Sequence, residues 1–187
     1  LLDTAEEALD VLGPDTPVEE HTGAQLGALM AVAATAGRDK LTFHMDDRIA
    51  SLGGWLEQLI AESTGKHGVG ILPVVGEGPD APDAAGRLHV IIGDTDVDPA
   101  TLDGPWVHLP VEEPEDLGAQ VVLWEFATTL AGIVLGINPF DQPDVESAKR
   151  EARSVLEGGA PSAPTVSLDE VLALLVPGDA LVIGAFV

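Results

Sequence analysis

Cysteine is absent from the sequence, and only eight of its 187 residues are Lys or Arg. Without cysteine the chain has no disulfide, thiol nucleophile or thiolate metal site, which suits a cytoplasmic protein. Nucleic-acid binding needs clustered cations, and the three tryptophans are too scattered to form a platform on which bases stack. An anionic membrane surface is disfavoured by the same lack of positive charge. We therefore expect neither nucleic acid nor membrane among the partners.

Acidic residues dominate the charge, with 32 Asp and Glu giving a formal net charge of -24. Disordered acidic chains combine such charge with low hydrophobicity. Here 45% of the residues are apolar and the mean hydropathy is +0.23. The length suits one domain or slightly more, so we expect a folded protein with an apolar core and carboxylates on its surface.

Apolar residues recur with alternating helix and strand periods from residue 21 onward. Helices are predicted at 22–36 with Thr22 as N-cap, at 46–65 with Asp46 or Asp47 as N-cap, and at 114–135, 142–157 and 167–175. Strands are predicted at 40–45, 69–75, 88–92, 106–109 and 180–187, and loops at 76–86 and 161–164. Strands that are unbroken apolar runs between helices indicate an α/β fold with a mainly parallel sheet covered on both faces.

The predicted helix at 114–135 is unusually apolar, because Glu125 is the only charged residue between Leu117 and Ile137. Its length would allow it to span a bilayer. Thr128 and Thr129 interrupt the apolar run, however, and no basic residues flank it as membrane anchors do. A helix that is apolar nearly all round is more typical of the buried helix of a sandwich, which is what we expect here.

The first candidate chemical segment ends the predicted helix at 46–65. Glu62 is followed there by Ser63, Thr64, Gly65 and Lys66. A carboxylate partly shielded from water at the end of a helix is suited to act as a general base. The alternative is an ordinary solvated glutamate in the last turn of a helix, and composition does not decide between the two.

The second candidate segment leaves the apolar helix and enters the next one, from Gly136 to Lys149. Gln142 and Lys149 are two helical turns apart, so they share one face if the helix extends that far. Lys149 is followed closely by Arg150 and Arg153, which is where this acidic chain would tolerate an anionic ligand. The alternative is ordinary salt bridging to neighbouring glutamates on the helix.

Other motifs that carry chemistry are missing. The five histidines show no paired-ligand spacing, and His89 lies on a predicted strand, where a structural role is more common. No glycine-rich loop of the kinds that hold phosphate groups is present. No metal or cofactor is therefore predicted.

The runs 58–66 (Gln-Leu-Ile-Ala-Glu-Ser-Thr-Gly-Lys) and 138–143 (Asn-Pro-Phe-Asp-Gln-Pro), the latter leading to Lys149, resemble the two characteristic segments of the glucose-6-phosphate isomerase family. The runs 37–42, 124–128 and 177–179 resemble, more narrowly, the isomerase half of bacterial bifunctional transaldolase/glucose-6-phosphate isomerases. The resemblance implies a three-layer αβα sandwich of the sugar isomerase (SIS) type. It also implies interconversion of glucose 6-phosphate and fructose 6-phosphate through a cis-enediol(ate), a step of glycolysis and gluconeogenesis.

The resemblance also implies roles for individual residues. Glu62 corresponds to the base that moves a proton between C1 and C2, and Lys149 to the active-site lysine. Gln142 corresponds to a glutamine near the phosphate. Three further residues of the motif are expected to bind substrate: Ser63, Thr64 and Lys66. Asp144 departs from the family, which usually has a small residue there, and its carboxylate would repel an anionic substrate.

Parts of the family pattern are not found, namely the Gly-Gly-Arg segment, the ring-opening histidine and the transaldolase half. We therefore expect 1–20 to be an acidic lead-in and 21–187 to be the second SIS-type subdomain of a longer chain. This piece should be inactive alone, its partners being a phosphosugar and the remaining isomerase segments, with a homodimer also expected. The alternatives are a non-catalytic SIS-type module that binds phosphosugars and a purely structural remnant.

Overall fold

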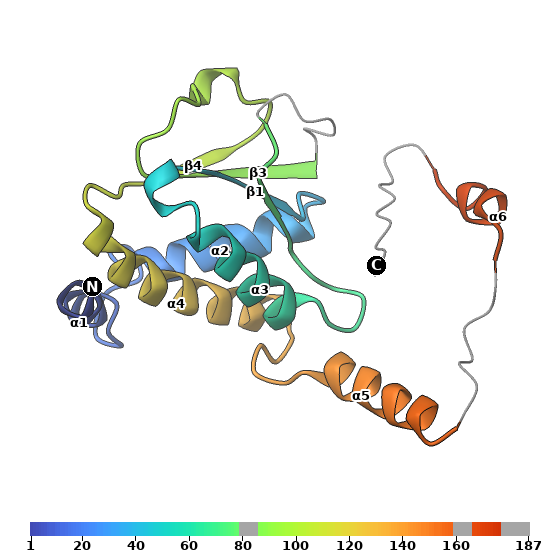
Figure 1. Cartoon of the computed structure of the whole chain (residues 1–187). Helices are drawn as coiled ribbons and strands as arrows, with labels where there is room; N and C mark the ends of the chain where they lie inside the picture. The colour runs from blue at the N-terminus through green and yellow to red at the C-terminus, as the bar shows by residue number, and fades with distance from the viewer. Residues whose placement is uncertain (79–85, 159–165, 177–187) are drawn as a thin grey trace. The chain divides into compact units, whose positions relative to one another are not determined.

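Four parallel strands form one sheet in the order β2-β1-β3-β4 (Figure 1). They are β1 (Lys40–Met45), β2 (Leu72–Val75), β3 (Arg87–Ile92) and β4 (Trp106–Leu109). The predicted α/β fold with a parallel sheet is confirmed. The strand predicted at 69–75 begins only at Leu72, because Val69 pairs instead with Lys66 across a tight turn.

The computed structural model describes residues 1–78, 86–158 and 166–176, and the chain divides into two compact units, Leu1–Pro143 and Asp144–Val187. Most of the loop predicted at 76–86 lies outside the described residues, as do the loop at 161–164, the run 177–179 and the strand at 180–187. The predicted lead-in at 1–20 belongs to the first unit.

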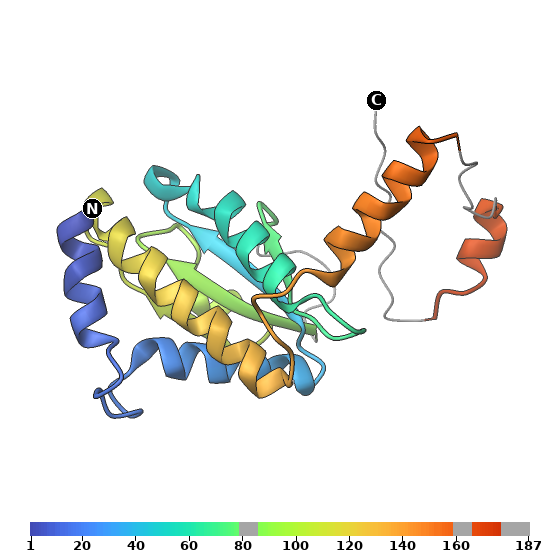
Figure 2. The ribbon, with the colours of Figure 1, turned by 90° about the horizontal axis from the view of Figure 1, so that it is seen from below.

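Four helices of the first unit lie on one face of the sheet (Figures 1 and 2). They are α1 (Leu2–Val11), α2 (Thr22–Thr35), α3 (Leu52–Thr64) and α4 (Leu117–Leu135). On the other face the connection from β3 to β4 carries the short 3-10 helix η3 (Pro99–Thr101). The described residues therefore form one of the two helical layers of the predicted sandwich, the layer made by α1 to α4. The helices α5 (Pro143–Leu156) and α6 (Leu168–Leu172) follow along the chain.

Helix α4 is the centre of the helical layer and packs against α1, α2 and α3. Trp124 is fully buried, and its ring meets that of Phe43 on β1 edge to face at 5.4 Å. By length and composition the helical stretch Pro114–Leu135 is the one candidate membrane span among the described residues, but half of its most apolar window is buried inside the fold. It therefore has the packing of a core helix.

Two helix starts differ in detail from the sequence prediction. Thr22 does not cap α2, because the Nδ1 atom of His21 accepts the free backbone N–H of Ala24 at 3.1 Å. Asp46 caps the 3-10 helix η1 (Asp47–Ile49), and α3 begins only afterwards, at Leu52. At α2 the cap lies one residue ahead of the predicted one, whereas Asp46 is one of the two predicted caps but begins a 3-10 helix instead of α3.

The sheet face away from the helices is polar and yet buried. His44 and His89 stack with ring centroids 5.3 Å apart, and His44 Nε2 lies 3.1 Å from His89 Nδ1. Beside them the Arg87 guanidinium donates to Thr42 Oγ1 at 2.8 Å and pairs with Glu77 at 2.8 Å. Burial, followed by the charge of Arg87, lowers the pKa of His89, and burial also lowers that of His44. Both imidazoles are therefore neutral at pH 7.

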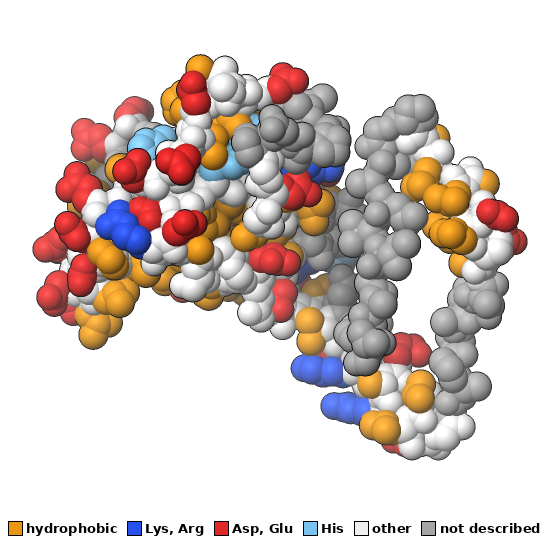
Figure 3. All heavy atoms as spheres, turned by 45° about the horizontal axis from the view of Figure 1, so that its top comes forward, with side chains coloured by type: hydrophobic (Ala, Val, Ile, Leu, Met, Phe, Trp, Pro, Cys, Tyr) orange, Lys and Arg blue, Asp and Glu red, His pale blue; other side chains and the backbone are white. Residues whose placement is uncertain are grey.

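Acidic side chains are spread over the visible surface of the first unit (Figure 3). This distribution is the one that composition predicted, because carboxylates are seldom buried without partners. The apolar residues of the core lie mostly between the helical layer and the sheet. The acidic side chains seen in this view thus lie on the surface of the first unit.

Candidate active site

The carboxyl edge of a parallel sheet is the usual place for a ligand in this class of fold. A cavity of about 550 Å³ lies there, at the ends of β1, β2 and β3. Among the described residues its charged lining is entirely acidic, consisting of Asp46, Asp47, Glu77, Asp94 and Asp96. Such a lining repels a phosphate group, so this cavity does not suit an anionic sugar.

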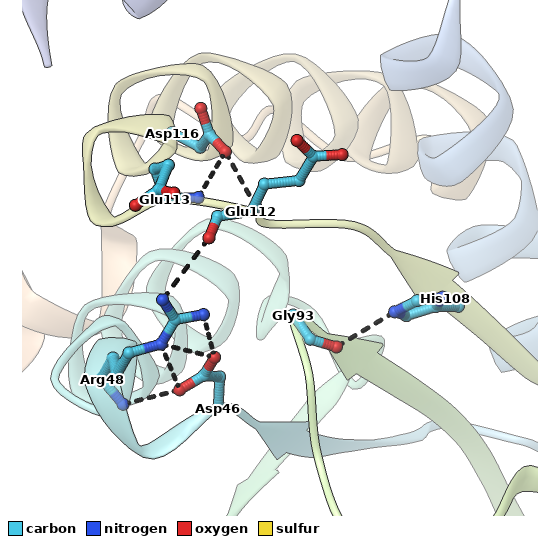
Figure 4. A network of polar contacts seen from close by, with 7 residues as sticks. All are labelled: Asp46, Arg48, Gly93, His108, Glu112, Glu113 and Asp116. Carbon is cyan, nitrogen blue, oxygen red and sulfur yellow. Dashed lines mark hydrogen bonds and ion pairs between the residues drawn. The ribbon is translucent and has the colours of Figure 1, made fainter.

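Figure 4 shows what the polar groups beside this cavity do. The Arg48 guanidinium pairs with Asp46 at 2.6 Å and donates to the carbonyl of Glu112 at 3.4 Å. The hydrogen bonds from Arg48 hold the pKa of Asp46 below its usual range. Asp116 accepts the backbone N–H groups of Glu112 and Glu113, which lowers its pKa too. These contacts join the segment before α4 to η1. The positive charge of Arg48 is balanced by the Asp46 carboxylate.

The second candidate location is the last turn of α3, which runs back from the carboxyl edge of the sheet (Figure 1). Glu62 lies there with two amide donors on its carboxylate. Gln58 Nε2 is 3.2 Å from Oε1, and Gln142 Nε2 is 3.1 Å from Oε2. The structure thus brings Glu62 and Gln142 together across 80 residues of sequence. Glu62 is exposed, which fits the alternative of a solvated glutamate rather than that of a carboxylate shielded from water.

The loop that carries Gln142 is shaped by its own residues. Gly136, with φ 73°, ends α4 in the left-handed conformation that glycine adopts most easily. Pro139 lies against Gly132, where a Cβ would be 3.1 Å from the proline ring. Asn138 Oδ1 accepts the N–H of Phe140 at 3.1 Å, which closes a turn. Gln142 stands two residues after this turn.

Lys66 and Thr64 are buried, with 3% and 0% of their surfaces exposed. The Lys66 ammonium donates to the carbonyl oxygen of Asn138 at 2.7 Å and to that of Asp141, and it pairs with the Asp141 carboxylate at 3.0 Å. The Thr64 hydroxyl donates to the Ile60 carbonyl at 2.8 Å and accepts the N–H of Ile71 at 3.0 Å. The polar groups of both residues are therefore engaged within the protein.

Ser63 and Lys149 are the two remaining predicted site residues. Ser63 is half-buried and lines a cavity of about 450 Å³ between α1, α3 and α4. Lys149 belongs to the second unit, where it lies on helix α5. Its exposed ammonium lies 2.9 Å from Glu146 Oε1 and lowers the pKa of that carboxyl group. Arg150 and Arg153 are exposed on the same helix, α5.

Sequence reasoning missed three residues of this arrangement, Gln58, Asn138 and Asp141. Gln58 could have been found, because it stands four residues before Glu62 and so lies on the same face of α3. The carbonyl groups of Asn138 and Asp141 leave no signal in a sequence. Within the described ranges, no three His, Asp or Glu side chains are grouped so as to hold a metal ion.

Known proteins similar to this chain point to one family. A glucose-6-phosphate isomerase of Heliobacterium modesticaldum is 30% identical in an alignment 154 residues long, which covers 56% of this chain and 34% of that protein. One from Alkaliphilus metalliredigens is 40% identical over 50 residues, 27% of this chain and 11% of that protein. One from Streptococcus gordonii is 37% identical over 67 residues, 36% of this chain and 14% of that protein. No family model matches the chain.

The fold is shared with a solved structure, a hypothetical protein of Thermus thermophilus, at a TM-score of 0.64. The two sequences are 20% identical, and the likeness covers 84% of this chain and 50% of the other. The chain is thus an α/β protein with distant, partial similarity to glucose-6-phosphate isomerases. It spans about a third or less of the length of these curated relatives.

Proposed function

We propose that this chain forms part of an isomerase that interconverts glucose 6-phosphate and fructose 6-phosphate. The observation that carries the proposal is the pair of hydrogen bonds on Glu62, from Gln58 and Gln142. These bonds orient one carboxylate at the junction of the two segments that resemble the isomerase family. Distant similarity to glucose-6-phosphate isomerases supports the same reaction.

Glu62 is the proposed base. In the open-chain aldose the hydrogen on C2 lies next to the C1 carbonyl, so a base can remove it as a proton and leave a cis-enediolate. Returning the proton to C1 gives the ketose, while a second proton passes from O2 to O1. One carboxylate can therefore serve both carbon centres, provided that it is held within reach of both.

The remaining roles follow from charge. Lys149 is proposed to stabilise the negative oxygen of the enediolate, as an ammonium group can do when it is close. Arg150 and Arg153 would add a local positive field for an anionic phosphosugar on a chain of net charge -24. Ser63 remains a candidate substrate contact.

An exposed carboxylate is not yet a complete active site. Proton abstraction beside a carbonyl benefits from the exclusion of water. Glu62 is exposed in this structure and is therefore in contact with solvent. We therefore propose that the remaining segments of a longer isomerase cover Glu62 and supply the group that opens the sugar ring. The protein would be cytoplasmic, act in glycolysis and gluconeogenesis, and form a homodimer; fusion to a transaldolase is part of the same proposal.

The test is Glu62→Gln in the complete protein that contains this chain. We expect turnover to fall about 10²- to 10⁴-fold, the range for loss of a general base, with fructose 6-phosphate binding preserved. Glu57→Gln is the matched control, because Glu57 is exposed on the same helix and should leave turnover unchanged. Unchanged turnover in Glu62→Gln rejects the assignment. A wild-type protein that binds fructose 6-phosphate without turnover supports the rival, a non-catalytic phosphosugar-binding module.

A further inference from the structure

Lys66 has an unusual environment for a lysine, because its whole side chain lies inside the protein. Only 2% of the side chain is exposed. An ammonium group has three N–H donors and no acceptor. All three are matched here by the Asn138 carbonyl, the Asp141 carbonyl and the Asp141 carboxylate. No donor is left over for a substrate.

The backbone of Lys66 is fixed independently of its side chain. Lys66 N–H donates to the Val69 carbonyl at 2.8 Å, and Val69 N–H donates back to the Lys66 carbonyl at 2.9 Å. The two residues between them, His67 and Gly68, have φ of 55° and 77°. Positive φ at both central residues is the mark of a tight hairpin turn. This turn follows directly on α3, whose last turn carries Glu62.

The partners of Lys66 belong to the loop that ends in Gln142. Asn138 and Asp141 lie four and one residues before Gln142, whose amide donates to Glu62 Oε2 at 3.1 Å. Lys66 thus holds the loop to the segment that follows α3. In the other direction, the Gln142 amide of the loop donates to Glu62 in the last turn of α3. Without this tie, the loop would depend on the exposed hydrogen bond between Gln142 and Glu62 for its polar attachment to α3.

We propose that Lys66 is a positioning residue: it holds the loop 138–141 so that Gln142 orients the Glu62 carboxylate. This inference rests on the proposed isomerase function and assigns Lys66 a role other than substrate contact. It acts through Gln142 on the proposed base, and a misplacement of about 1 Å in such a group can lower a rate about 100-fold.

A double-mutant cycle in the complete protein tests this role. Lys66→Met keeps the length of the side chain and removes the ammonium. We expect kcat to fall about 10- to 100-fold with KM nearly unchanged. In a Gln142→Ala background the same substitution should cost little more, because residues that act through one another are not additive. Lys40→Met is the matched control, since it removes a lysine from the start of β1 and should leave kcat unchanged.

Hydrogen exchange supplies a readout that does not depend on activity. The loop amides of Ile137 and Phe140 are protected by bonds of 3.0 and 3.1 Å. We expect Lys66→Met to speed exchange across 137–142 and Lys40→Met to leave it unchanged. Exchange that stays at the wild-type rate in Lys66→Met overturns the proposal. A rise in KM with full kcat, additive with Gln142→Ala, also overturns it, because Lys66 would then meet the substrate directly.

Asp141→Asn is a milder variant in case Lys66→Met does not fold. It removes only the ion pair and keeps both carbonyl acceptors, so kcat and loop protection should fall in the same direction but less. Wild-type values for both would overturn the proposal. Failure of the proposed function is recognised separately. Full turnover in Glu62→Gln would reject Glu62 as the base, whereas faster loop exchange in Lys66→Met would still show that the lysine holds the loop.

Discussion

Gly27 marks a close backbone approach between α2 and α4, and it makes a quantitative prediction about the helical layer. A Cβ atom at position 27 would lie 2.4 Å from the carbonyl oxygen of Ala127 and 2.9 Å from the Cβ of Leu130. Both separations are well below a normal contact, and the oxygen belongs to the backbone of α4. Gly27→Ala therefore forces the two helices apart.

The expected loss of stability has two parts. Overpacking of a close core contact costs about 1–3 kcal/mol, and a clash with backbone belongs at the upper end. Alanine recovers up to about 1 kcal/mol because it favours the helix over glycine. The free energy of unfolding of Gly27→Ala should therefore be about 2 kcal/mol lower than that of the wild type.

Gly54 on α3 is the matched control. A Cβ there meets nothing within 4 Å, so Gly54→Ala should raise the free energy of unfolding by about 0.5 kcal/mol. Urea titration followed by the intrinsic fluorescence of the three tryptophans, of which Trp124 is fully buried, measures both variants. With a typical slope of about 2 kcal/mol per molar urea, the Gly27→Ala midpoint should fall by about 1 M. A midpoint at or above the wild-type value would refute the close approach of α2 to α4.

Two further predictions concern pH. Because burial lowers the pKa of His44 and of His89, the unfolded chain binds protons that the folded one does not. Stability should therefore be complete above about pH 6.5 and fall below it by up to about 1.4 kcal/mol per pH unit for each histidine. Urea titrations at several pH values measure how the free energy of unfolding falls with pH. An equal fall in a variant with both histidines replaced by leucine would show that His44 and His89 are not its cause. Likewise, Arg48 lowers the pKa of Asp46, so stability from this pair should be present above the ordinary aspartate pKa of about 4 and lost as pH falls through the lowered value. Asp46→Ala should therefore destabilise the protein at pH 7 more than at pH 3, and an equal effect at both would count against the pair.

The helix ends show how far local sequence signals reach. The capped helix predicted at 167–175 is present as α6, where Ser167 and Glu170 form a capping box. The start of α2 was less predictable, because His21 and Thr22 both offer an acceptor and only the chain entering the helix decides between them. The polar sheet face was not predicted either. Its strands were correctly placed, but the stacking of His44 on His89 depends on the parallel pairing of β1 with β3.

The sequence by itself determined the α/β class, the parallel strands, the long buried helix and the two segments that resemble an isomerase. Helix and strand periods are local patterns, and so are motifs, so they can be found without knowing which parts of the chain meet. Only the tertiary structure decided that Gln142 reaches Glu62 and that Lys66 is buried beneath the loop 138–141. These contacts join residues more than 70 positions apart, and the lysine is recognised there by backbone carbonyls. Every residue carries such a carbonyl, so only the folded chain shows which ones face the lysine.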